Sequence, residues 1–415
     1  MPRALPLTLL AACLAAGLTV PARAGTAPSV PSAAPAVETP ALFDDDAGGN
    51  ADGDDPAVWR HPGDPARSLV LGTAKEGGLH VYALDGRVIQ HVPAPPAPGP
   101  DDESGRFNNV DLVPGRDLAV VTDRGRDTLR FYRVSGTGVT DVTDPAVPLL
   151  FNRTQDEVNE QRTPYGLAVF TREGRAYAVV SRAGTSTLAL VELLGTRAGY
   201  TYRTVRTIEL PTAFRLPDGT SWTPCLEPGE DPQVEGMVVD ARTGVLYAAQ
   251  ETVGIWRLPA TLRGEPKLVD RVREFGVPGV YDPGTEECVP GADPGFGGRR
   301  LAADVEGLTI HYGGGYLIAS GQGDDTFVIY DRRDGRYLRS FKIGAGNGLD
   351  GVQESDGAAV FDGPLGPAFP RGLLVVHDGD NTPVVTDPSG EPRENTNFKF
   401  VRWDAVARPL GLVVR

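Results

Sequence analysis

Residues 234–256 read VEGMVVDARTGVLYAAQETVGIW, and this stretch carries the pattern that decides the fold. A polar residue and a glycine open a short apolar strand over 235–239. A polar turn leads to a second strand over 245–249, and a tight turn leads to a third over 253–256. Short apolar runs separated by turn residues are typical of β-strands.

The same pattern occurs six times along the chain. The first strands start at Asp55, Asn109, Tyr165, Glu235, Glu306 and Asp356, which lie 54, 56, 70, 71 and 50 residues apart. A repeat of about 40 to 50 residues with four strands in each unit is typical of a propeller blade. The longer spacings are explained by insertions at 212–234 and 272–299. The sequence therefore predicts an all-β fold, a six-bladed β-propeller of four-stranded antiparallel blades around a central channel.

The N-terminus has the pattern of a secretory signal peptide. An apolar run over 5–20 follows one early cation, and Ala22-Arg23-Ala24 provides a cleavage site, so we expect 1–24 to be removed. Residues 25–42 are rich in Ala, Pro and Ser and predict a flexible leader. The propeller is expected to fill 43–415. We therefore expect a secreted protein, extracellular or periplasmic, that does not interact with a membrane.

The composition argues against a nucleic-acid partner. The 415 residues contain 40 basic and 55 acidic side chains, a net charge of −15 at pH 7. A nucleic-acid-binding protein is usually basic. An anionic ligand would therefore need a local basic patch or a bound cation.

The repeat also predicts which polar side chains meet. In a propeller, the starts of the innermost strands and the turns between second and third strands face the same mouth of the channel. The starts provide Asp55, Asn109 with Asp111, Tyr165, Glu235, Glu306 and Asp356, and the turns provide Lys75, Arg124, Arg182, Glu251, Gln322 and Asp380. The cations come from blades one to three. The acids Glu235, Glu251, Asp304, Glu306, Asp350, Asp356, Asp378 and Asp380 come from blades four to six.

This separation of charge predicts a metal and an anion at the mouth. Clustered carboxylates repel one another and normally require cations. Ligands that are all oxygen atoms favour Ca²⁺ over Zn²⁺. Lys and Arg complement phosphate oxygens, so phosphate is the expected guest. Two other functions stay open at this point, a Ca²⁺-dependent propeller hydrolase of the lactonase type and a non-catalytic binding propeller.

Several segments resemble one enzyme family in consistent order from about residue 50 to 405. They include DDPAVW (54–59), NNVDL (108–112), VEGMVVD (234–240), DVEGLTIHY (304–312), YLIASGQGDDTFVIY (316–330) and VVHDGDN (375–381). These segments are similar to the β-propeller phytases, secreted calcium-dependent phosphatases. The resemblance implies a calcium cluster at one mouth and two neighbouring phosphate sites, one for cleavage and one for affinity. It also implies stepwise hydrolysis of myo-inositol hexakisphosphate (phytate) by a calcium-activated water.

The resemblance assigns roles to individual residues. Phosphate contacts fall on Lys75, Arg124, Tyr165 and Arg182, and with Glu235 and Glu251 these form the expected catalytic set. Calcium or water-positioning roles fall on Asp54, Asp55, Asn109, Asp111, Glu235, Glu251, Asp304, Glu306 and Asp356, and further calcium positions on Asp350, Asp378, Asp380 and Asn381. The expected partner is a small molecule, phytate as its calcium complex, and the expected state is a monomer. Asp324-Asp325 in place of an Asn pair and Gln250 in place of a Glu depart from the family pattern.

Two cysteines remain after removal of the signal peptide, which takes Cys13 with it. Cys225 and Cys288 each lie in one of the two insertions. An even number of cysteines in an oxidising compartment favours a disulfide. We therefore predict a Cys225–Cys288 bond that ties the insertions together.

Overall fold

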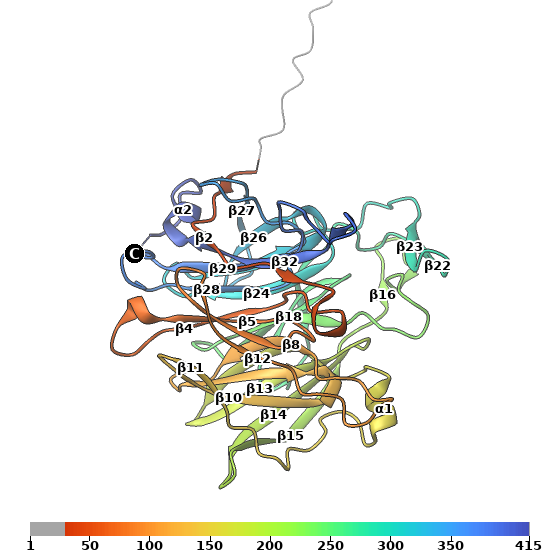
Figure 1. Ribbon diagram of the computed structural model, residues 1–415. Helices are drawn as coiled ribbons and strands as arrows, with labels where there is room; N and C mark the ends of the chain where they lie inside the picture. The colour runs from red at the N-terminus through yellow and green to blue at the C-terminus, as the bar shows by residue number, and fades with distance from the viewer. Residues whose placement is uncertain (1–29, 415) are drawn as a thin grey trace, which may run out of the picture. The chain divides into compact units, whose positions relative to one another are not determined.

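Six antiparallel sheets follow one another along the chain, one for each predicted repeat (Figure 1). The computed structural model describes residues 30–414. Blades one to three are β4 (Pro56–Trp59), β5 (Leu69–Thr73), β6 (Leu79–Ala83) and β7 (Val88–Val92); β8 (Phe107–Leu112), β9 (Leu118–Asp123), β10 (Thr128–Ser135) and β11 (Gly138–Asp141); and β12 (Pro164–Arg172), β13 (Arg175–Arg182), β14 (Thr187–Gly195) and β15 (Tyr200–Glu209). Blades four to six are β18 (Val234–Asp240), β19 (Val245–Gln250), β20 (Gly254–Pro259) and β21 (Lys267–Arg271); β24 (Val305–His311), β25 (Tyr316–Gly321), β26 (Thr326–Asp331) and β27 (Tyr337–Ile343); and β28 (Ala358–Phe361), β29 (Leu373–Asp378) and β32 (Asn395–Arg402).

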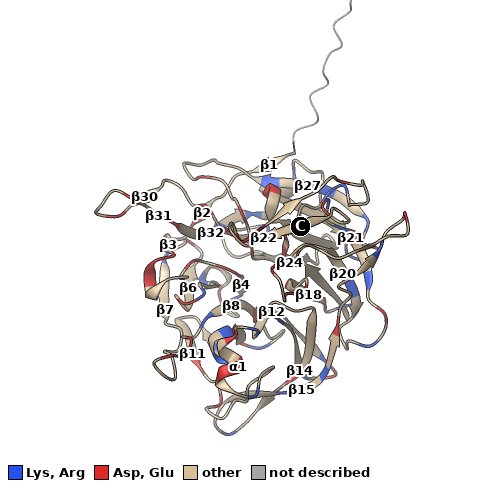
Figure 2. Ribbon diagram, turned by 90° about the vertical axis from the view of Figure 1, so that its right-hand side faces the viewer, with Lys and Arg blue, Asp and Glu red and all other residues tan. Residues whose placement is uncertain are grey.

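The innermost strands close into a ring. β4, β8, β12, β18, β24 and β28 contact one another in this order, and β28 returns to β4. Figure 2 shows five of these strands, β4, β8, β12, β18 and β24, meeting around a common centre. Between blades, apolar faces pack against each other, as where Leu71 and Val81 of blade one meet Phe107 and Val121 of blade two. The predicted six-bladed β-propeller is confirmed.

The glycine that follows the polar start in four of the repeats has a steric cause. At each one, the inner strand of the next blade brings a backbone carbonyl to where a Cβ atom would stand. The pairs are Gly166 with Glu235, Gly236 with Glu306, Gly307 with Asp356 and Gly357 with Asp54, at 2.0, 2.0, 2.7 and 2.6 Å from an ideal Cβ. Any side chain would push the blades apart, so the repeated glycine allows the inner strands to approach closely.

Residues 30–42, the described part of the predicted flexible leader over 25–42, pair with the blades instead of forming a free leader. Three short strands, β1 (Ser32–Ala33), β2 (Val37–Glu38) and β3 (Leu42–Phe43), pair with the last two blades. β2 supplies the fourth strand of blade six. Ala33 and Leu42 are buried, and Pro-rich sequence is compatible with extended backbone. Composition therefore misplaced the start of the domain, whereas the predicted signal peptide, 1–24, lies outside the described residues.

The remaining elements are connections. The helices are α1 (Gln155–Asn159) and α2 (Trp403–Ala407), and the short 3-10 turns are Asp46–Gly48, Pro65–Arg67, Arg124–Arg126 and Gln322–Asp324. The insertions carry β16 (Phe214–Arg215) with β17 (Ser221–Trp222) and β22 (Gly279–Asp282) with β23 (Glu287–Pro290), and blade six carries β30 (Val385–Thr386) with β31 (Pro392–Arg393). A Cys225–Cys288 disulfide joins the two insertions across 63 positions of sequence. Among residues 30–414, no helix is long and apolar enough to cross a membrane.

Candidate active site

Three glutamates form the centre of the mouth, the end of the channel where the inner strands begin. Glu235 and Glu306 open β18 and β24, and Glu251 follows β19 in the turn to the third strand. One carboxylate oxygen from each lies within 4.8 Å of the other two. We call these three residues the acidic centre. It contains glutamates from both predicted rings, so the two rings do meet at one end of the channel.

Burial makes this arrangement unfavourable without a cation. Burial, together with the neighbouring carboxylates, raises the pKa of Glu251 and of Glu306 well above the ordinary value. Burial and Glu235 likewise raise the pKa of Asp54 well above its usual range and that of Asp356 to about 8. A bound cation would oppose these shifts, because a nearby positive charge favours the ionised form of each carboxyl group.

Unpartnered oxygen atoms indicate where a cation fits. Among the described residues, Glu251 Oε1, Glu306 Oε2 and Asn108 Oδ1 are buried and accept no hydrogen bond. Buried polar atoms are normally paired, so several orphaned acceptors in one place point to an unseen partner. Oxygen atoms of carboxylates and carboxamides suit a hard cation such as Ca²⁺.

Asn108 belongs to the site although the sequence analysis passed over it. Its side-chain nitrogen donates to Glu235 Oε1 at 3.0 Å, to Asn109 Oδ1 at 3.2 Å and to Asp54 Oδ1 at 3.3 Å. One amide thus links acids of blades one and four through blade two. The sequence shows two adjacent asparagines at 108–109, but only Asn109 was expected at the start of the inner strand. The neighbouring Asn108 was the feature that could have indicated a second carboxamide at the mouth.

The cationic side of the mouth also matches the predicted residues. The ammonium of Lys75 pairs with Asp52 Oδ2 at 2.5 Å. Burial opposes its charge, but Asp54, Asp52 and Asp356 outweigh that effect and raise the pKa of Lys75. A positive charge is therefore held at the edge of the acidic residues.

Arg124, Tyr165 and Glu235 form a connected row. The Arg124 guanidinium lies 5.1 Å from the centre of the Tyr165 ring, and the Tyr165 hydroxyl donates to Glu235 Oε2 at 2.5 Å. Burial and the nearby Arg106 lower the pKa of Arg124. Nε of Arg124 and Nε of Arg106 are buried without a partner in the described part of the chain. Arg106 is a further cation that the repeat did not reveal, since it precedes the start of the strand.

Arg182 is engaged differently from Arg124. Its Nε donates to the carbonyl of Arg162 at 2.8 Å, and its Nη2 donates to Asn152 Oδ1 at 2.8 Å. Two of its five N–H donors are therefore occupied by protein. The Asn152 amide nitrogen is occupied as well, because it donates to the same carbonyl at 3.1 Å.

Asp55 and Asp111 lie deeper than the mouth. Each accepts a backbone N–H from the inner strand of the next blade, Asp55 from Val110 at 3.1 Å and Asp111 from Val169 at 2.7 Å. Both line a channel cavity of about 220 Å³ together with Asn109. These contacts join successive blades, and both Asp111 oxygens are engaged, since the second accepts from Leu112 N at 2.7 Å.

Asp350, Asp378 and Asn381 form a separate group around a lysine. The buried ammonium of Lys399 pairs with Asp350, and it lies 3.2 Å from Asp378 Oδ2 and 3.1 Å from Asn381 Oδ1. Glu38 Oε2 of the closing strand β2 accepts from the same ammonium at 2.6 Å. We call these residues the blade-six cluster. Asp380 is exposed and makes no side-chain contact with it among the described residues.

The residues that depart from the family pattern have their own partners. The Gln250 amide donates to the Pro232 carbonyl at 2.8 Å and accepts from Trp256 Nε1 at 2.8 Å. A carboxylate could not donate, so this position suits Gln better than Glu. Asp324 pairs with Arg273 at 2.9 Å, outside the acidic centre.

The tied insertions border the acidic side of the mouth. A small cavity beside the disulfide is lined by Trp222 and Cys225 of the first insertion. Thr252, which follows Glu251 in the sequence, and Ala303, which precedes Asp304, line the same cavity. Burial and Glu274, which the second insertion supplies, raise the pKa of Asp304 to about 6.

Comparison with known proteins finds one matching family and a relative within it. A family model described as Phytase matches residues 7–201 and 283–413. The 3-phytase of Bacillus subtilis (strain 168) is 31% identical over 385 residues, which cover 88% of this chain and 83% of the relative. Residues 202–282 of this chain, which lie between the two matched ranges, include the first insertion and part of the second.

Solved structures are similar only at low identity. A calcium-binding protein, regucalcin, from Agrobacterium tumefaciens strain C58 is 11% identical with a TM-score of 0.44, over 90% of this chain and 96% of that one. A chain of a nidogen/laminin complex is 12% identical with a TM-score of 0.43, over 79% of this chain and 92% of that one. At these TM-scores, neither likeness adds to the assignment.

Proposed function

The chain belongs to the phytase family, and on this premise we propose that it is a secreted phosphomonoesterase that hydrolyses phytate stepwise with calcium as its cofactor. The observation that supports the proposal best is the meeting of opposite charges at one mouth. The acidic centre has buried oxygens without partners, and Lys75 and Arg124 lie on its edge. A binding propeller would have no need for this costly arrangement.

The acidic centre fits calcium by the chemistry of its donors. Glu235, Glu251 and Glu306 would hold the ion or ions, with Asp54, Asp304, Asp356 and Asn109 close enough to complete the set. Bound there, calcium would supply a Lewis acid that neutralises phosphate charge and activates water. Asp55 and Asp111, each of which accepts from the next blade through one oxygen, are assigned to joining blades.

The chain's own residues would bind and orient the phosphate. Lys75 and Arg124 offer charged donors to the phosphoryl oxygens, and charge-assisted hydrogen bonds of this kind are the strong ones. Tyr165 keeps its proton, because burial and Glu235 raise the pKa of its hydroxyl well above the ordinary value. Its O–H therefore stays a donor to Glu235 and fixes the direction of that carboxylate.

A second phosphate position follows from Arg182. Three of its N–H donors remain beyond those held by Arg162 and Asn152. We assign it to a neighbouring phosphate on the same ring, which supplies affinity. A substrate with adjacent phosphates, such as phytate, would use both positions.

The blade-six cluster is proposed as a secondary calcium position that affects stability. An ion at Asp350, Asp378, Asp380 and Asn381 would compete with the Lys399 ammonium for the same oxygens. Since the protein supplies its own cation there, calcium is not expected to be essential to the fold at this place.

Secretion and a monomeric state complete the proposal. The Cys225–Cys288 disulfide suits an oxidising compartment. Size-exclusion chromatography with light scattering and N-terminal sequencing of the exported protein test both points.

The deciding experiment is phosphate release from phytate by the purified protein, with calcium, with excess chelator, and with calcium restored. We expect release only when calcium is present. A lactone substrate serves as a parallel arm. Lactone hydrolysis without phosphate release, or no release at saturating calcium, would overturn the proposed function.

A further inference from the structure

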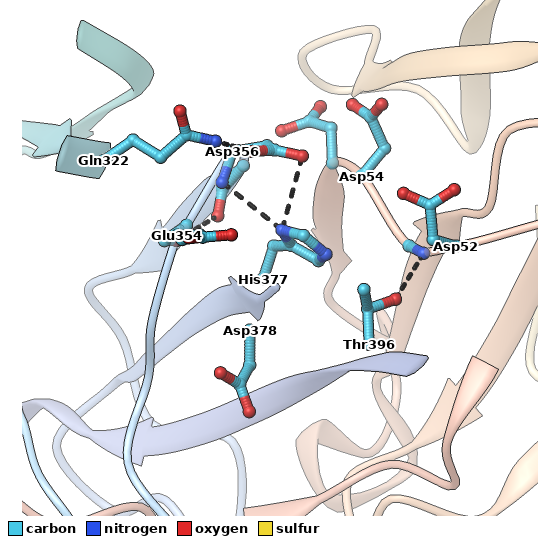
Figure 3. A network of polar contacts seen from close by, with 12 residues as sticks. Asp52, Asp54, Gln322, Glu354, Asp356, His377, Asp378 and Thr396 are labelled. Carbon is cyan, nitrogen blue, oxygen red and sulfur yellow. Dashed lines mark hydrogen bonds and ion pairs between the residues drawn. The ribbon is translucent and has the colours of Figure 1, made fainter. Parts of the chain in front are cut away.

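His377 is a buried histidine beside the mouth that the proposed chemistry does not use. It lies on β29, only 2% exposed, and its backbone N–H donates to the Gly357 carbonyl at 3.0 Å. Figure 3 shows the ring between the loop that carries Asp356 and the loop that carries Asp52 and Asp54. The imidazole therefore separates two acid-bearing segments from blades six and one.

One ring nitrogen contacts Asp356 at two points. Nδ1 accepts from the Asp356 backbone N–H at 3.3 Å and lies 3.5 Å from Asp356 Oδ2. On the other side, Gln322 Nε2 donates to Asp356 Oδ1 at 2.7 Å (Figure 3). The neutral imidazole thus fixes the backbone of Asp356 through its N–H, and the Gln322 amide fixes one oxygen of its carboxylate.

The second ring nitrogen has no partner. Since Nδ1 accepts, Nε2 carries the proton in the neutral ring, and Nε2 is buried without a hydrogen bond in the described part of the chain. The ring edge also abuts Gly53, where a Cβ atom would lie 3.2 Å from His377 Cδ2. The hydrogen bond that the ring accepts from the Asp356 backbone N–H is therefore the polar contact that a buried apolar ring at this place could not make.

We propose that His377 is a positioning residue that holds Asp356 in the orientation required for calcium at the mouth. The proposal rests on Asp356 being a calcium ligand in the function proposed above. Residues behind metal ligands orient them, and their loss typically weakens metal affinity 10- to 100-fold. His377 acts in this way from the adjacent strand, and Gln322 supports Asp356 from blade five.

The test compares three variants of the full mature chain. His377→Phe keeps a ring and removes both nitrogens, whereas His377→Gln retains an acceptor and a donor. Phe398→Leu is the matched control, because Phe398 packs edge-on against His377 with ring centroids 6.0 Å apart but has no polar side-chain atom to offer Asp356. Calcium affinity is measured by isothermal titration calorimetry with CaCl₂ alone, alongside melting temperature and the calcium dependence of phosphate release.

We expect His377→Phe to weaken calcium binding about tenfold or more and to raise the half-activating calcium concentration equally. Its kcat at saturating calcium should stay within about threefold of the wild type. His377→Gln should bind calcium like the wild type, and Phe398→Leu should melt earlier with unchanged calcium affinity. If His377→Phe is insoluble, His377→Leu takes its place with the same expectation.

Unchanged calcium affinity in the Phe or Leu variant overturns the proposal and leaves His377 a packing residue. Equal weakening in Phe398→Leu also overturns it, because packing alone would then explain the effect. Failure of phosphate release is a separate outcome. The calorimetric comparison still decides the role of His377 if the chain binds calcium but does not cleave phytate.

Discussion

Replacement of Arg124 by Ala is expected to damage catalysis while sparing the fold. The guanidinium has a buried Nε without a partner, and its main contact is with the face of Tyr165. It is therefore held ready for an anion rather than used to hold the structure. A hydrogen bond to a charged group contributes about 1.5–3 kcal/mol, which corresponds to a loss of about 10- to 150-fold in kcat/KM.

Arg182→Ala provides the matched comparison. This change removes a cation of the same kind but leaves Asn152 Oδ1 without its donor and the Arg162 carbonyl with the Asn152 amide alone. A higher KM and a lower melting temperature are expected, because the side chain serves both structure and affinity. Arg124→Ala should instead lower kcat with a melting temperature within a few degrees of the wild type.

Steady-state kinetics on phytate at saturating calcium and differential scanning calorimetry measure both effects. The reasoning fails if Arg124→Ala keeps kcat/KM within threefold of the wild type. It also fails if the two variants lose stability equally, since the difference in their protein contacts would then have no consequence.

Four further outcomes are expected. Glu235→Gln, which removes charge at nearly constant shape, should lower phytate turnover at least 100-fold with little change in melting temperature; a stability loss with retained turnover would contradict this. Excess chelator should abolish phosphate release with only a small change in melting temperature, because Lys399 already pairs with the blade-six acids, and a large drop in melting temperature would contradict this. Mass spectrometry of non-reduced peptides should find Cys225 linked to Cys288, and activity should survive reduction; two alkylatable thiols in the native protein would exclude the bond. Burial raises the pKa of Asp123 to about 7, so the folded state binds this proton more tightly than the unfolded state does. The free energy of unfolding should therefore fall as pH rises from about 4 to about 7. Asp123→Asn should flatten that slope in thermal melts, and an unchanged slope would refute the assignment.

The repeat was sufficient to predict the blades because its cause is local. Each blade needs apolar alternation, a polar turn and, in four cases, a glycine beneath a neighbouring carbonyl, as Gly236 shows beneath Glu306. The closing strand was missed because its cause is not local. Val37 and Glu38 pair with Phe400 and Lys399, more than 350 positions away, and nothing in an Ala/Pro-rich segment marks that partner.

The mouth was predictable for the same reason as the blades. Equivalent positions in a repeat lie at equal height, so Glu235 and Glu306 could be placed together before any coordinates were known. Asn108 and Arg106 were missed because they precede the repeat position Asn109 by one and three residues, and His377 was missed because it lies on a second strand. Their roles depend on which way a side chain turns, and periodicity carries no information about that.

Residue type alone does not show which of two acidic groups, the acidic centre or the blade-six cluster, needs calcium. Both consist of carboxylates with a carboxamide in or beside the group, Asn381 in one and Asn108 beside the other, and both fit the ligand preference of calcium. In the blade-six cluster, Lys399 reaches three acids and an amide oxygen, so each of these acids already has a cationic partner within the protein and part of their negative charge is offset. At the acidic centre, Glu251 Oε1 and Glu306 Oε2 have no such donor, and Lys75 is paired with Asp52. The need for an external cation is therefore concentrated at the mouth, where the phosphate-binding cations also lie, and it is there that calcium would link binding to chemistry.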